Sequence, residues 1–174
     1  MMFTELDTTV GSSTANSYGT LQELKDYFAH RSEASEFLAM SDEVLIARLI
    51  QATLINDVSL TPVGKLASNE QSLLFPRDAL VDKHGRTYRN DEIQKQVKYA
   101  QFEQALYCNM NNIMLPSILT QGFSEAKLDV MSIKLDKDFV PKKLSYEATD
   151  FLSLFGEVDS SNSTGSKTVR VIRY

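Results

Sequence analysis

The chain has 174 residues, of which 43% are hydrophobic and 24% are charged, a composition typical of one globular domain. It contains no run of about 20 apolar residues, the length that a membrane-spanning helix needs. The formal net charge of −5 argues against extensive wrapping of nucleic acid, because phosphate binding depends on Lys and Arg side chains.

The N-terminal residues 1–19 are acidic at first and then rich in Ser, Thr and Gly. We expect an extended arm here, without a signal peptide. The stretch that follows, "LQELKDYFAHR", has apolar residues at helical spacing. Thr20 before it and Glu23 three residues later form a capping box, so we predict a helix that begins after Thr20.

A second helix is predicted in "SDEVLIARLIQATLI". Ser41 is its N-cap, and Asp42 and Glu43 lie in the first turn, where the helix dipole favours acidic residues. Its apolar residues form a wide stripe: Val44, Leu45, Ile46, Leu49, Ile50, Leu54 and Ile55. A helix that is apolar over most of its circumference is covered on several sides, so we predict that this is the central helix.

The residues 57–90 contain several prolines and glycines and no clear periodicity. A loop of this length inside a compact domain is often functional. Its apolar patch "SLLFPRD" is predicted to pin the loop onto the core. We take four of its residues as the loop anchor: Leu74, Phe75, Pro76 and Arg77.

A third helix, "DEIQKQVKYAQFEQALYCNM", is predicted to be capped by Asn90 and to end before the "NMNN" cluster. The pattern "KLDVMSIKL" predicts two short strands or one bulged strand. A last helix is predicted in "SYEATDFLSLFG", with Gly156 just past its end. The fold class is therefore mainly α: a small bundle of about four helices over residues 1–156, with a long structured loop, a minor β element and an extended C-terminal strand.

No catalytic or metal-binding pattern is recognisable. His30 and His84 are isolated, and no Cys or second His stands at metal-ligand spacing from either. Cys108 ends an apolar helical pattern, which favours a small buried hydrophobe over a reactive thiol. We therefore expect no enzyme activity, no metal and no cofactor.

The basic stretch "KHGRTYRN" is the strongest candidate for a nucleic-acid contact. Lys83, Arg86 and Arg89 are the residues that would meet phosphates. The alternative is a solvated loop tip, which the overall acidity favours.

The C-terminal segment reads as a flexible linker over residues 157–166 and a strand over residues 167–174. Ordering the strand costs about as much backbone entropy as burial of its Val and Ile side chains returns. It therefore needs a neighbouring strand that pairs its backbone groups. A linker of this length spans up to about 33 Å, enough to reach another subunit; the alternative is a disordered end. The predicted subunit- or portal-contacting residues are Lys167, Val169, Arg170, Val171, Ile172 and Arg173.

Five stretches, in this order, resemble a known family. They are "ANSYGTLQELKDYF", "LLFPRDALVDKHGR", "NDEIQKQVKYAQFEQAL", "GFSEAKLDVMSIKL" and "GSKTVRVIRY". The family is that of tailed-bacteriophage head-to-tail connector (adaptor) proteins, often labelled DnaT-like single-stranded-DNA-binding proteins. The resemblance covers nearly the whole chain, with one departure at Phe75, where family members usually carry Trp before the Pro-Arg pair.

The resemblance implies a homo-oligomeric ring of twelve copies, located in the virion beneath the portal protein and assembled in the host cytoplasm. Such a ring extends the DNA channel and docks tail or nozzle proteins, and no membrane is involved. DNA would pass through without specific binding, because acidic residues repel phosphates. The alternative is a single-stranded-DNA-binding replication accessory protein, as the family label suggests; such a binder would show a basic, aromatic surface.

Overall fold

The computed structural model describes residues 5–111, 125–128, 131–134 and 143–159, with the side chains of residues 5–110 and 143–159. The helices in this part of the chain are α1 (Leu21–Phe28), a 3-10 turn (Ser32–Ala34), α2 (Ser35–Leu38), α3 (Asp42–Ser59), α4 (Lys95–Asn111) and α5 (Tyr146–Leu152). The strands are β1 (Leu60–Pro62), β2 (Lys65–Leu66), β3 (Arg77–Asp78), β4 (Glu125–Leu128), β5 (Met131–Lys134) and β6 (Gly156–Val158).

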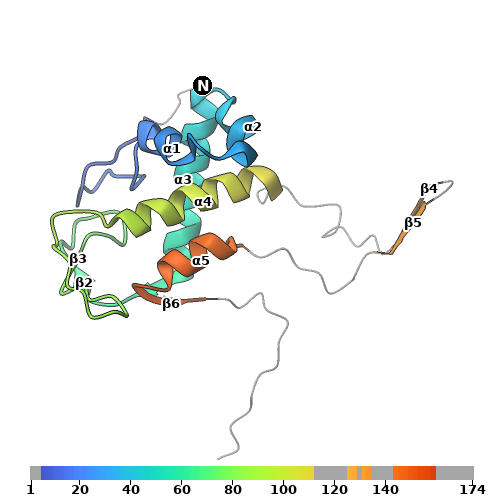
Figure 1. Cartoon of the computed structure of the whole chain (residues 1–174). Helices are drawn as coiled ribbons and strands as arrows, with labels where there is room; N and C mark the ends of the chain where they lie inside the picture. Colours follow the sequence, from blue (N-terminus) through green and yellow to red (C-terminus); the bar gives the residue numbers. More distant parts are fainter. Residues whose placement is uncertain (1–4, 112–124, 129–130, 135–142, 160–174) are drawn as a thin grey trace, which may run out of the picture.

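The helices build the core, which confirms the predicted mainly α fold. α4 packs across α3, and α5 packs on α4 (Figure 1). α1 contacts both α3 and α4. One apolar cluster lies between α4, α5 and the long loop, and a second lies between α1, α2, α3 and α4.

Gln101 of α4 carries a fully buried side-chain amide. Its NH2 group lies 2.6 and 2.8 Å from the hydroxyl oxygens of Ser17 and Thr53 and 3.1 Å from the carbonyl oxygen of Leu49, so its two hydrogens are shared among three acceptors. Its oxygen accepts from the backbone N–H of Gly19. The amide is buried between α3, α4 and the N-terminal segment. Because both its oxygen and its nitrogen have hydrogen-bond partners, burial does not leave an unpaired polar group.

Three of the predicted helix starts are confirmed. Thr20 and Glu23 form the complete capping box of α1. Ser41 occupies the N-cap of α3, although its side chain makes no capping hydrogen bond. Ser145 caps α5 by accepting from the N–H of Ala148.

The start and the end of the third predicted helix are wrong. α4 begins at Lys95 instead of directly after Asn90, and it continues to Asn111, through the first part of the "NMNN" cluster. The Asn90 side chain donates to Asp78 at 3.3 Å, so it makes a loop contact in place of a helix cap. The last predicted helix also ends early, at Leu152. The short helical pieces Ser32–Ala34 and Ser35–Leu38 have no counterpart among the predicted elements.

The sequence predicts that the second helix, α3, is covered on several sides, and the structure confirms this for one face only. The face of α3 with Leu45 and Leu49 is fully buried against α4 and α1. On the opposite face, Val44 and Leu54 are exposed. Helical periodicity identified the apolar residues, but it did not show that packing takes up only one of the two faces.

The long loop carries short strands that hold it to the rest of the chain. β1 pairs antiparallel with β6, with Leu60 opposite Val158, and β2 pairs antiparallel with β3. Glu157 and Val158, which the sequence assigns to the linker, therefore belong to a strand. β4 and β5 pair antiparallel, which confirms two short strands in place of one bulged strand.

Gly156 does not serve only to end the last helix. A Cβ at this position would lie 2.2 Å from the carbonyl oxygen of Thr61, so the approach of β6 to β1 requires glycine. The chain continues to Asp159, whose N–H donates to the carbonyl of Ser59 at 2.8 Å. The predicted strand over 167–174 and most of the predicted linker lie outside the described residues.

Candidate functional site

A groove of about 730 Å³ lies between α1, the turn before α4 and α4 itself. Its aromatic residues are Tyr27, Tyr88, Tyr99 and Phe102, its basic residues are Arg86, Lys95 and Lys98, and its acidic residues are Glu23, Asp26 and Glu92. Aromatic and basic groups in one groove are the combination that binds single-stranded nucleic acid. The three acidic groups, however, offset the three basic ones, so the groove has no net positive charge to attract phosphates.

Several of these groups already have partners within the chain. The Tyr27 and Tyr99 rings lie 4.6 Å apart, and Tyr99 also meets Phe151. The Lys98 ammonium donates to the Glu23 carboxylate at 2.6 Å. Stacking on a base would have to compete with these ring contacts, and phosphate binding would have to compete with the ion pair.

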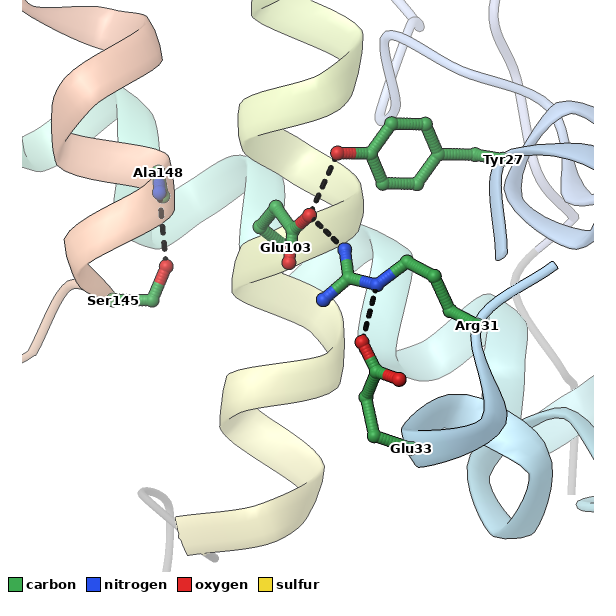
Figure 2. A network of polar contacts seen from close by, with 6 residues as sticks. All are labelled: Tyr27, Arg31, Glu33, Glu103, Ser145 and Ala148. Carbon is green, nitrogen blue, oxygen red and sulfur yellow. Dashed lines mark hydrogen bonds and ion pairs between the residues drawn. The ribbon is translucent and has the colours of Figure 1, made fainter. Parts of the chain in front are cut away.

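Glu103 of α4 is the centre of a polar network that joins α4 to α1 and the turn after it (Figure 2). The Tyr27 hydroxyl donates to its carboxylate at 2.6 Å, and the Arg31 guanidinium forms an ion pair with the same oxygen. Arg31 also contacts the exposed Glu33 at 2.7 Å. Burial, together with the hydrogen bond to Glu103, raises the pKa of Tyr27 well above its ordinary value. The network fixes α1 on α4 and presents no unpaired acid or base.

Asp57 joins the end of α3 to the long loop. The Tyr18 hydroxyl donates to one carboxylate oxygen at 2.6 Å, and the N–H of Leu74 donates to the other at 3.2 Å. Burial disfavours the charged carboxylate and raises the pKa of Asp57 to about 6. The pair has a structural role, since both oxygens are used to hold the loop.

The structure places the four predicted loop-anchor residues directly beside this pair. The Phe75 ring is buried and meets the rings of Tyr18 and Phe155 at 5.9 Å, in edge-to-face geometry. The buried Arg77 guanidinium donates to the carbonyls of Val63 and Gly64, both at 2.7 Å, and of Leu74 at 3.3 Å. Leu74 is half-buried against the same cluster and Pro76 is buried. These contacts attach the loop to the core.

The predicted phosphate contacts do not converge on one point. Lys83 donates to the Ser153 hydroxyl at 3.0 Å, and Arg89 forms an ion pair with Asp91. Arg86 is exposed and lines the groove. Asp82 organises the turn by accepting from the N–H groups of His84 and Arg86 and from the Tyr88 hydroxyl. The turn therefore carries its own acidic group among the basic ones.

Reactive groups are few in the part of the chain that the structure describes. Cys108 is buried, and burial raises the pKa of its thiol, so the nucleophilic thiolate is disfavoured. Among the described residues, no group of His, Cys, Asp or Glu is arranged to hold a metal ion. In the same ranges, no helix has the length and apolar character that a membrane crossing needs.

An exposed apolar stripe runs along the outer face of α3. We define this α3 stripe as Val44, Ala47, Gln51, Leu54 and Val58 of α3 together with Met40, which lies just before the helix; Gln51 is its one polar member and is half-buried. Leu54 is 61% exposed and Val58 is 80% exposed, although both are large apolar side chains in the middle and last turns of a well-packed helix. Exposed apolar side chains that line up on one face of a helix are typical of an interaction site.

Sequence reasoning found part of these features. The sequence predicts that Val44 and Leu54 are covered like the rest of the apolar stripe, whereas the structure exposes both. The aromatic groove was missed, because its residues come from separate elements and none of them is conspicuous in its own segment. The predicted contact residues 167–173 lie outside the described residues.

Comparison with protein-family models matches residues 3–173 to the family described as "Putative DnaT-like ssDNA binding protein". Comparisons with curated proteins and with solved structures found no match. Since the family model spans nearly the whole chain, the protein belongs to this DnaT-like family.

Proposed function

We propose that the protein is a structural subunit of a virion, a head-to-tail connector that forms a ring beneath the portal, extends the DNA channel and docks tail components. The observation that carries the proposal is the α3 stripe, because an assembly subunit presents apolar surface to its neighbours. In this proposal the protein is not an enzyme and needs no cofactor. The portal and the ring come from the family resemblance of the sequence.

The distribution of charge also supports an assembly role. Residues 160–174 contain Lys167, Arg170 and Arg173 and no acidic residue, a charge of +3; the total of −5 therefore leaves −8 on residues 1–159. An acidic body repels DNA that passes through a channel. A basic end, for which the sequence predicts a strand, complements an acidic neighbour. We propose that residues 167–174 contact the adjacent subunit or the portal.

Deletion of residues 167–174 tests this proposal. The truncated protein is expected to keep its helical circular dichroism, because the described core lies within residues 5–159, and to lose assembly on the portal. A matched control replaces the same eight residues by Gly and Ser, which keeps the length and removes the apolar and basic side chains. Normal assembly of both variants would contradict the proposed contact.

A second candidate function, binding of single-stranded DNA, is favoured by the family description and by the aromatic groove. The neutral charge of the groove and the internal partners of Tyr99 and Lys98 argue against it. We expect no measurable binding of a labelled oligonucleotide in a fluorescence titration at physiological salt. A sub-micromolar affinity that weakens with salt and is lost in Tyr99→Ala would favour this second function over the connector.

A further inference from the structure

The residues of the α3 stripe have a spacing that suits a helical partner. They are separated alternately by four and three residues, the a and d spacing of a heptad repeat. Within α3, Val44, Gln51 and Val58 take the a positions and Ala47 and Leu54 take the d positions, whereas Met40 precedes the helix. All are exposed except Gln51, which is half-buried.

The stripe is a preformed surface. The opposite face of α3 is held by Leu45, Leu49 and Ala52, which are fully buried. α3 has 18 residues and is therefore about 27 Å long. A second helix can lie along this length without any rearrangement of the core.

The charges beside the stripe select the partner and its direction. Glu43 stands at a g position and Arg48 at the e position five residues later. In a parallel pair of helices, each g residue of one helix faces the e residue five positions later on the other helix. Each Glu43 would then meet Arg48 of the second copy. Arg48 donates to Gln51 at 2.8 Å, but a guanidinium has five N–H donors and can serve both acceptors.

An antiparallel arrangement lacks this complementarity. It places e positions opposite e positions, and Arg48 is the only charged e residue of α3, since the other one is Ile55. Arg48 would then find no carboxylate across the interface. The charge pattern therefore favours two copies in the same direction.

We propose that α3 is the docking surface for a second copy of this chain, with the two α3 helices parallel along the α3 stripe and Glu43 of each copy paired with Arg48 of the other. The inference rests on the proposed function only in that copies of the chain associate. The contact is two-fold, because the same stripe serves both copies, so it closes as a dimer and is distinct from the head-to-tail contact between neighbours in a ring.

Sedimentation equilibrium of the full chain tests the surface. The wild type is expected to self-associate, and Leu54→Glu to weaken this association about tenfold or more, because a buried Leu is exchanged for a charge. Val10→Glu is the control, since Val10 is an exposed apolar residue outside the stripe. A monomeric wild type, or equal association of all three proteins, would overturn the proposal. Because Leu54 is exposed, its substitution leaves the core unchanged.

Cysteine cross-linking tests the direction. In a parallel pair, each d residue faces its own copy, so Ala47→Cys is expected to form a disulfide-linked dimer under mild oxidation. Ala29→Cys, at an exposed alanine after α1, is the matched control. A yield no higher than that of the control excludes the parallel contact.

A charge exchange adds a third readout. Glu43→Arg alone and Arg48→Glu alone are expected to weaken association, and the double variant is expected to restore it, because the pairs re-form with reversed sign. Failure of the double variant to recover would contradict the Glu43–Arg48 pairing. Association through α3 without any assembly on a portal would refute the connector function and leave this contact standing, whereas a wild type that assembles on a portal but sediments as a monomer when free would do the reverse.

Discussion

Glu103 has the least exposed side chain of the ion-paired residues in the described ranges, at 5%. Glu33 contacts the same Arg31 from a position where 57% of its side chain is exposed. The two carboxylates offer a comparison of a buried and an exposed partner for one guanidinium. A buried charge that loses its partner is costly, whereas an exposed pair contributes little.

We predict that Glu103→Gln lowers the free energy of unfolding by about 2 kcal/mol, because Arg31 and Tyr27 lose a charged acceptor. Urea denaturation of the purified protein measures this value. Glu33→Gln is the matched control and is expected to unfold like the wild type. An equal loss in both variants would contradict the structural role of Glu103.

Asp57 is predicted to make stability depend on pH. Its pKa is raised to about 6 in the folded protein, from an ordinary value of 3.8, so the folded state binds a proton more readily than the unfolded state. Ionised Asp57 therefore lowers stability above pH 6, and stability is regained as the pH falls through 6 toward 3.8. Relative to Asp57→Asn, the wild type should gain about 1–3 kcal/mol between pH 7 and pH 4.5.

Urea denaturation of both proteins at several pH values in this range measures the difference, and contributions of all other carboxyl groups cancel between the two. A difference that stays constant, or that falls with decreasing pH, would show that the Asp57 carboxyl is not buried as described.

At the scale of elements, α1 and α3 have N-caps of different quality. Thr20 accepts from the N–H of Glu23, whereas Ser41 makes no side-chain capping bond. We predict that Thr20→Ala lowers the free energy of unfolding by about 1 kcal/mol, and that Ser41→Ala has a smaller effect. Thermal or urea denaturation of the two variants compares them directly, and the opposite order would contradict the assigned capping geometry.

Helix caps and strand pairings differ in how far they can be predicted from the sequence. The Thr20 cap of α1 lies three residues from its partner Glu23, so a local pattern predicts it. The start of α4 was missed because Asn90 bonds to Asp78, twelve residues away. The pairing of β1 with β6 joins Leu60 to Val158, a contact across most of the chain that no local pattern contains.

The α3 stripe, the Glu103 network and the aromatic groove could be predicted only in part, because they depend on contacts between distant segments of the chain. The apolar residues of α3 were visible in the sequence, but burial depends on which elements pack against the helix. Tyr27 and Arg31 reach Glu103 across more than 70 residues of chain, and the aromatic groove likewise combines distant segments. The DnaT-like family label, in contrast, is readable from ordered short stretches and is confirmed by the match over residues 3–173, whereas the connector role stays a proposal.

The whole molecule combines an acidic helical body, an apolar stripe on its central helix and a basic C-terminal segment. These features favour association with protein over capture of DNA. The nearly neutral aromatic groove is the one feature of the described residues that favours the second function, and its tyrosines already pack against one another.

The most direct measurement is electron microscopy of the purified chain mixed with the portal protein that the connector proposal names as its partner. The connector function predicts an additional ring of density on one face of the portal, with the channel continuous through both. Portal particles that remain unchanged at saturating concentrations of the chain would contradict it.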